Sequence, residues 1–289
     1  HSPTLNRLEA LVLDSNHISD PGALDIASSK HLGNLVQLYM HDNKIGHAGE
    51  TALRAMRSRN LLDKKRNDNN LNLNEQRLDN KDIASLAQYE KLDGIVSLSL
   101  RNNHFDYHGV QELANSPYLK NLTSLNLMSS AVKDKGLILL AESPSLSQLE
   151  ILNLENTGIT SLGILALSQS PHISQLKELN LSNNNLGKKG FRILAESKNF
   201  KNLVKLRISG VSIGDAGFQT IVQSNTLNQL EELEIMGNAI SRKSLDSLLD
   251  SKLFSHLKKL DLRRNTLRDV DLIFLADSPK FQILEALRF

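Results

Sequence analysis

The chain carries few residues whose types and spacing could support chemistry. His104 and His108 stand four residues apart, a spacing at which two histidines on one helical face can share a metal ion. No GxxxxGK[ST] phosphate loop, GxSxG nucleophile turn or HExxH zinc motif occurs, and the many carboxylates form no isolated acid and base pair. We therefore expect no enzyme activity and no cofactor from these residues, and the two histidines matter only if the fold brings further ligands to them.

Composition excludes several classes of protein. The 289 residues are 40% hydrophobic and 23% charged, which is enough to fold a sizeable core. Lysine and arginine number 34 against 32 acidic residues, so the broad basic surface of a nucleic-acid binder is missing. The absence of cysteine excludes disulfides and thiolate metal sites, and no apolar run approaches the roughly 20 residues of a membrane span.

A fixed period organises the sequence. The second leucine of each LxL pair serves as a reference position, and nine of the ten steps between successive references are 27 residues long. Self-similarity at this period predicts a solenoid of stacked units. The reference positions are Leu13, Met40, Leu73, Leu100, Leu127, Leu154, Leu181, Ile208, Ile235, Leu262 and Phe289.

One step of the repeat is irregular. Met40 and Leu73 are 33 residues apart, so six extra residues must be accommodated near DKKRNDNN at 63–70. Because this octapeptide is polar and fills no repeat position, we expect it to form an exposed, mobile loop. Its run of three basic residues, Lys64 to Arg66, is too short to indicate a localisation signal.

Each unit begins with a short strand and a polar turn. In LxxLxL the alternation places Leu179 and Leu181 on one buried side of a strand. Three positions after the reference, nine of ten residues are polar, as at Asn184. An amide at this position can bond backbone groups freed by the turn, and stacked copies would form a ladder. Val211, the exception, should leave a gap.

A helix completes each unit. Nine positions after the reference stand Gly, Asp or Ser, all favoured at helix N-caps, and Asp20, Asp134, Asp215 and Asp269 compete as caps two positions earlier. Apolar residues at offsets 10, 13 and 14 form one helical face, and Ser-Pro pairs end several helices. By this register the two histidines fall in a turn and at a helix entrance, so they do not share a helical face.

Stacking of these units predicts the fold class. Parallel strands would line one wall and helices the other, giving a curved α/β solenoid with the sheet on its concave face. The run LxxLxLxxNxIxxxGxxxLA at 176–195 resembles the leucine-rich repeat, and the length of the unit is similar to its ribonuclease-inhibitor-like class. This resemblance implies a horseshoe whose concave face binds a protein. The uniform units and missing cysteines do not fit ribonuclease inhibition.

The resemblance leaves several functional readings open. The LAxSPxL joints look like those of bacterial repeat proteins, including secreted effectors. We expect the cytoplasm as the location, or secretion into a host cell if the protein is an effector. One alternative is a targeting arm for a catalytic domain outside these residues. Another is a GTPase-activating protein, for which Arg101 is the one suitable arginine. We treat residues 1–289 as a single domain of about ten units, cut mid-repeat at both ends, and expect it to be a piece of a longer protein.

The residues that face out of the strands suggest where a partner would bind. Three positions before the reference, Glu178, Lys205, Glu232 and Lys259 alternate in charge, which predicts neutralising pairs or a lattice matched to a charged partner. The position after the reference varies and follows no pairing rule, as either partner selection or drift would produce. Methionine and tyrosine on this wall would anchor an interface. The predicted partner-binding residues are Tyr39, His41, Arg101, Met128, Glu155, Arg207, Met236 and Arg263.

Overall fold

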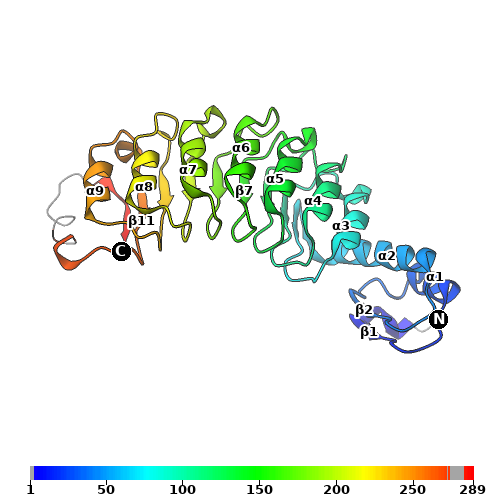
Figure 1. Cartoon of the computed structure of the whole chain (residues 1–289). Helices are drawn as coiled ribbons and strands as arrows, with labels where there is room; N and C mark the ends of the chain where they lie inside the picture. The colour runs from blue at the N-terminus through cyan, green and yellow to red at the C-terminus, as the bar shows by residue number, and fades with distance from the viewer. Residues whose placement is uncertain (1–2, 272, 274–282) are drawn as a thin grey trace.

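Strands and helices alternate along a curved solenoid (Figure 1). The structure, a computed structural model, describes residues 3–271, 273 and 283–289. The helices are α1 (Asp20–Ser28), α2 (His47–Lys65), α3 (Asn80–Ala87), α4 (Tyr107–Ala114), α5 (Lys133–Ala141), α6 (Ser161–Gln169), α7 (Gly187–Glu196), α8 (Gly214–Val222) and α9 (Arg242–Leu249). The strands are β1 (Ala10–Val12), β2 (Gln37–Tyr39), β3 (Arg66–Asn67), β4 (Asn70–Asn72), β5 (Ser97–Ser99), β6 (Ser124–Asn126), β7 (Ile151–Asn153), β8 (Glu178–Asn180), β9 (Lys205–Arg207), β10 (Glu232–Glu234), β11 (Lys259–Asp261) and β12 (Ala286–Arg288).

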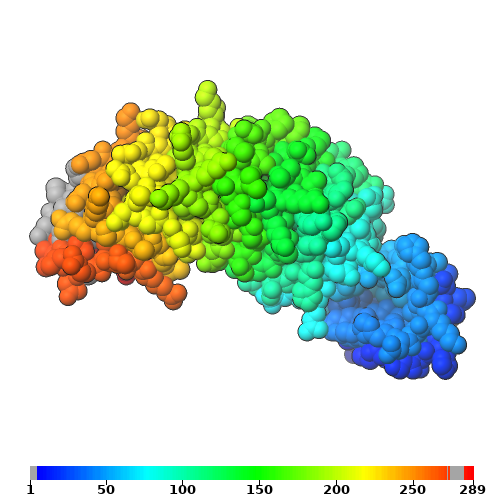
Figure 2. Space-filling model, viewed as in Figure 1, coloured from blue at the N-terminus to red at the C-terminus, as the bar shows by residue number. Residues whose placement is uncertain are grey.

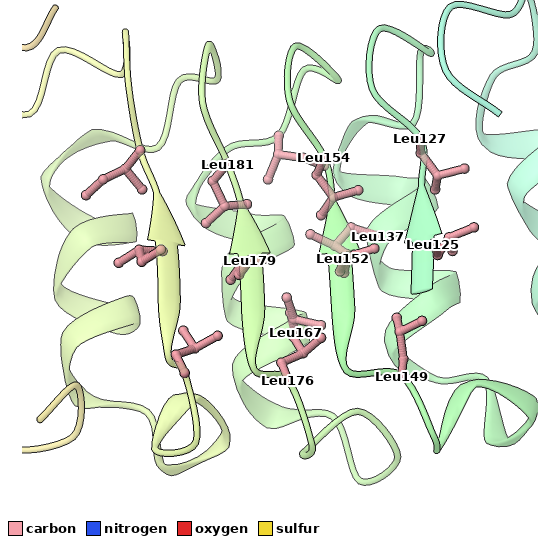
Figure 3. Close-up of a cluster of buried hydrophobic side chains, with 14 of the residues drawn as sticks. Leu125, Leu127, Leu137, Leu149, Leu152, Leu154, Leu167, Leu176, Leu179 and Leu181 are labelled. Carbon is pink, nitrogen blue, oxygen red and sulfur yellow. The ribbon is translucent and has the colours of Figure 1, made fainter. Parts of the chain in front are cut away.

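The predicted α/β solenoid is confirmed. Strands β4 to β12 pair in parallel with their sequence neighbours, and each residue pairs with the residue 27 positions further along, as Leu98 does with Leu125. The reference leucines point from the strands toward the helices, so that Leu127, Leu154 and Leu181 are completely buried (Figure 3). Because each coil covers the next, a strand of three residues is enough to hold a continuous core.

Asparagines at the turn hold neighbouring coils together. Asn184 donates its amide to the carbonyl of Leu181 in its own coil and to that of Leu154 in the preceding coil, at 3.0 and 2.7 Å. Its Oδ1 accepts the N–H groups of Thr157 and Ile159, at 3.2 and 2.9 Å. The ladder therefore runs from asparagine side chains such as Asn184 and Asn238 to the backbone of the coil before them, whereas, among the described residues, the Thr157 side chain bonds only its own coil and Val211 has no amide to make these bonds.

The helix-entrance aspartates act across coils. We expected Asp134 to compete for the N-cap of its own helix, but its Oδ1 accepts the N–H groups of Thr160 and Gly163, at 2.7 and 2.9 Å, in the following coil. A Cβ added to Gly163 would stand 2.7 Å from that oxygen, so glycine is required for this contact. Asp134 thus caps α6, one coil away, and the expectation of capping within the coil was wrong here.

Other coils repeat this contact. Asp20 accepts the N–H of Gly46 and Gly49, and Asn80 accepts those of Asp106 and Gly109. Where serine replaces glycine, at Ser244, its hydroxyl donates to Asp215 instead. The residue type that fits at a helix entrance therefore depends on the aspartate or asparagine side chain that contacts it from the preceding coil.

The expected loop at 63–70 is absent. Helix α2 has 19 residues and continues to Lys65, and a tight turn at Asp68 then joins β3 to β4 as an antiparallel hairpin. This unit lacks the Ser-Pro joint that stops other helices, and Leu61 and Leu62 are buried at 2% and 1% exposure. Because burial of these leucines favours continuing the helix, the extra residues lengthen α2 rather than forming a mobile loop.

The lengthened helix interrupts the sheet. Strand β2 pairs with β1 in a sheet of two strands, and β3 forms the edge of the separate ten-stranded sheet. Helix α2 contributes Met56 to a small core with Leu32 and Leu35, and Leu61 and Leu62 to the main core. The first two coils thus form a block that projects from the end of the curved body and is tied to it by α2 (Figures 1 and 2).

The asparagine ladder predicts a large loss of stability from one substitution. In the Asn184→Ala variant two carbonyls and two N–H groups lose their partner in a buried turn, which should cost about 3 kcal/mol of unfolding free energy. Asn16, at the same repeat position, is exposed and, among the described residues, donates only to Leu13 and Asp14, so Asn16→Ala should cost less than about 0.5 kcal/mol. Urea titration of both variants measures the difference, and equal effects would contradict the proposed role of the ladder.

Candidate protein-binding surface

The concave wall presents three rows of side chains, two from the strands and one from the residue after the reference. Along β6, for example, Ser124 and Asn126 are half-buried and face outward, while Leu125 points into the core. The next outward residue, Met128, follows the reference Leu127 and is also half-buried. Because the coils stack at the spacing of adjacent strands, about 4.8 Å, these rows form a continuous lattice.

The row after the reference varies in side-chain type, but its backbone is held by a regular set of hydrogen bonds. Nine of its ten backbone N–H groups bond in one of two ways. In the first way, the N–H bonds the side chain of the residue two positions earlier. The N–H of Met128 bonds Asn126 Oδ1 and that of Glu155 bonds Asn153 Oδ1, both at 3.0 Å. Asn74, Ser182 and Arg263 are held in the same way.

In the second way, the N–H bonds the side chain at the same row position in the preceding coil. The N–H of Arg101 bonds Asn74 Oδ1 at 2.8 Å, and that of Met236 bonds Ser209 Oγ at 3.1 Å. In the same way, the N–H of His41 bonds Asp14 Oδ1, and the N–H of Ser209 bonds Ser182 Oγ. Four members of the row, Asp14, Asn74, Ser182 and Ser209, are therefore occupied with the backbone of the next coil. Six side chains of the row accept no such backbone hydrogen bond among the described residues: His41, Arg101, Met128, Glu155, Met236 and Arg263.

Three of the predicted residues lie on successive coils. Arg101, Met128 and Glu155 follow β5, β6 and β7, and each is half-buried. Glu155 accepts amide hydrogens from Asn180 and Asn183 at 3.1 and 3.0 Å, which fixes its carboxylate. These neighbours bring a cation, a thioether and an anion to successive coils of the wall.

The carboxyl-terminal half of the wall is charged. Glu232 bonds Lys205 on one side and Lys259 at 2.6 Å on the other, so the expected alternation does produce ion pairs. Hydrogen bonds from Lys205 and Lys259 hold the pKa of Glu232 below its usual value. Arg207 continues the lattice, with its Nε 2.9 Å from Glu234.

Met236 and Arg263 complete a second group beside Arg207. Met236 is half-buried, and Arg263 is exposed and pairs with Asp261, whose pKa is lowered chiefly by this hydrogen bond. The small side chains of Ser182 and Ser209 separate this group from the one at Arg101. The wall thus brings six of the predicted residues into two neighbouring groups.

Tyr39 and His41 lie elsewhere. Tyr39 ends β2 and His41 follows it, on the two-stranded sheet beyond the interruption. The predicted set is therefore divided by the break between β2 and β3, which could not be foreseen while the extra residues were interpreted as a loop.

One half of the wall, at β4 to β7, has neutral strand rows, which we had not predicted; its charges, Arg101 and Glu155, stand in the row after the reference. Outward residues of β4 to β7 are almost all asparagine or serine, and none is charged: Asn70, Asn72, Ser97, Ser99, Ser124, Asn126, Ile151 and Asn153. The recurrent LNL and LSL triplets were the available signal. This half offers amide and hydroxyl groups, whereas the other offers paired charges.

The histidine pair does not gather ligands. His104 lies in the turn before buried Phe105, and His108 lies in the first turn of α4 with its Nδ1 3.0 Å from Asp106 Oδ1. Among the described residues, no three histidine, aspartate or glutamate side chains are placed to hold a metal ion. Likewise, none of the helices in the described ranges is both long and apolar enough to cross a membrane.

Comparisons with known proteins agree with this architecture. The sequence model of the family described as Leucine Rich repeat matches residues 4–27, 118–141, 172–192 and 255–276. The crystal structure of an internalin (inlF) from Listeria monocytogenes strain 4b F2365 is similar over 100% of this chain and 89% of its own, with a TM-score of 0.51 and 17% sequence identity. At this identity the likeness concerns the fold alone. No curated protein sequence matches the chain.

The lowered pKa of Glu232 predicts how pH acts on the charged half. A carboxylate with a folded-state pKa below its unfolded value, about 4.3, stabilises the fold above that value, and loses this contribution as pH falls through the folded pKa. The melting temperature of wild type should therefore exceed that of Glu232→Gln near pH 7, and the gap should narrow below about pH 4. A gap that stayed constant from pH 7 to pH 3 would show that these ion pairs do not stabilise the protein.

Proposed function

Because this chain is a leucine-rich repeat protein, we propose that it is a binding module and that a partner protein docks on its concave wall. The observation that carries the proposal is that the side chains after the strands are of two kinds, those that bond the backbone of the next coil and those that do not. Four side chains of that row bond the backbone of the next coil, whereas Arg101, Met128 and Met236 do not. We infer that side chains that do not hold the backbone of the next coil are the ones available to meet a partner.

The two halves of the wall suit different parts of one partner. Paired charges around Glu232 and Arg207 give electrostatic selectivity, because a mismatched partner would leave charges unpaired. The neutral half can bond polar groups without that cost. Met128 and Met236 supply adaptable apolar contacts within these polar surroundings.

Arg101 is the polar residue best suited to an anchoring role. Its guanidinium contacts Glu75, yet its Nε is buried and has no hydrogen-bond partner among the described residues. An acceptor on a partner could draw the side chain outward and satisfy this group. A targeting arm for a catalytic domain elsewhere would use the same wall, so both readings predict the same contacts.

Alanine substitution tests the wall directly. Arg101→Ala, Met128→Ala and Met236→Ala should leave the melting temperature nearly unchanged, and at least one should weaken partner capture by more than about 1 kcal/mol. Leu162→Ala is the matched control, since Leu162 is 58% exposed on helix α6.

Quantitative pull-downs with the immobilised chain compare these variants. Proteins retained by wild type and by the Leu162 variant, but lost from a concave variant, identify partners of the wall. If every retained protein bound all three concave variants as well as wild type, the partner site would have to lie on another surface.

A further inference from the structure

The interruption between β2 and β3 leaves the core of the second coil uncovered. Four residues of this coil, Leu38, Met40, Ile45 and Leu53, are half-buried, although they occupy core positions of the repeat. Their equivalents one coil later, Leu71, Leu73, Leu78 and Leu86, have exposures of only 0–2%. The difference arises because no following strand covers the second coil. All four line a groove of about 400 Å³.

The backbone beside this groove is also unpaired. In the next coil, the N–H groups of Leu73 and Glu75 bond the carbonyls of Ser99 and Arg101 at 2.8 and 3.0 Å. The equivalent N–H groups of Met40 and Asp42 have no acceptor among the described residues. An edge with free donors at every second residue is complementary to an extended chain.

The turn beyond β2 lacks a partner as well. Elsewhere an asparagine of the following coil accepts two N–H groups, as Asn103 Oδ1 does from Gln76 and Leu78. The equivalent donors, Asn43 and Ile45, have no such amide within the described part of the chain. The second coil is therefore missing both the strand and the asparagine that would normally follow it.

Arginine 57 limits where an added strand can begin. Its guanidinium donates to the carbonyls of Val36 and Gln76, at 3.2 and 2.7 Å, and bonds Asp82 at 2.7 Å. The Val36 carbonyl is the group that would otherwise accept the first N–H groups of a following strand, as the Thr123 carbonyl does. The open edge thus runs from Leu38 to Ile45.

Charge further defines the occupant. Arg54 and Arg57 in the groove are both paired with Asp82, whereas Asp42 and Glu50 place exposed carboxylates at its rim. Glu50 has a distant contact with Lys81 at 3.4 Å. A segment with basic side chains beside Asp42 would complement this rim.

From these observations we infer that β2 is a docking edge for an extended segment of another protein, which adds as a parallel strand with the pattern apolar-x-apolar-basic-basic-Asn. Its apolar side chains cover Leu38 and Met40, its carbonyls accept the N–H groups of Met40 and Asp42, and its asparagine accepts those of Asn43 and Ile45. This surface is separate from the concave wall, so the inference does not depend on the proposed function. Strand addition of this kind draws affinity from the backbone and selectivity from the side chains.

The chain itself contains a segment of this pattern that can serve as a probe. Residues 260–267, LDLRRNTL, form the strand and turn around β11. There the Asp261 carbonyl faces the preceding strand and accepts the N–H of Ile235, while the Leu262 N–H faces the following strand and donates to Arg288. A capped, fluorescent LDLRRNTL peptide should therefore bind the full chain saturably.

Backbone methylation separates strand addition from simple apolar binding. N-methylation at the peptide's Asp261 position blocks the edge that faces β2 and should weaken binding at least about tenfold, whereas N-methylation at its Leu262 position should leave affinity unchanged. Replacing its asparagine with leucine should also weaken binding. Equal affinity of the two methylated peptides would overturn the inference.

Protein variants locate the site. Leu53→Lys places a charge in the groove and should reduce peptide affinity at least about tenfold, while Leu24→Lys, at a position already 46% exposed on α1, should not. Circular dichroism of both variants checks that the fold is retained. Failure of the peptide to bind, no effect of Leu53→Lys, or self-association of wild type that Leu53→Lys abolishes would each overturn the inference, the last by assigning the edge to a second copy of the chain.

Discussion

Every coil depends on its neighbour to satisfy the backbone at the turn between strand and helix. Buried N–H and carbonyl groups there cannot reach water, and leaving one unpaired costs about 1–3 kcal/mol. Asn184 bonds the turn of the preceding coil, Asp134 caps the helix of the following one, and Asn74 holds the N–H of Arg101. Because some of these side chains bond the preceding coil and others bond the following coil, each coil is held from both sides. For this reason neighbouring coils hold one another in register, and the side chains of the concave wall repeat at a regular spacing.

The same dependence explains what happens where the array is interrupted. Once α2 continues through the position of the usual Ser-Pro joint, β3 folds back on β4 and no strand follows β2. The second coil then keeps all its repeat side chains but lacks the neighbour that they require. Half-buried Leu38 and Met40 and the unpaired donors beside them are direct consequences. A solenoid is most open to a partner where its own repetition stops.

Much of the fold could be predicted because spacing alone decides it. The LxxLxL alternation and the apolar face around Leu194 specify which sides are buried, so strand, helix and curvature follow. Contacts between coils could not be predicted in the same way, because the role of Asp134 depends on the distance to Gly163 in the next coil. The extra residues before Leu73 revealed an irregularity, but not that burial of Leu61 would extend the helix. On the wall, the varied row was noticed, whereas the bonds that occupy Asn74 and Ser209 required coordinates.

Hydrogen exchange at single-residue resolution tests the central claim, that each turn is protected by its neighbouring coil and that this protection ends at β2. The amides of Leu73, Glu75 and Leu100 have acceptors within the array and should exchange slowly, near the rate of global unfolding. Those of Met40 and Asp42, at equivalent repeat positions, should exchange orders of magnitude faster. Equal protection at the two sets of amides would contradict the account, because it would mean that the second coil is covered after all.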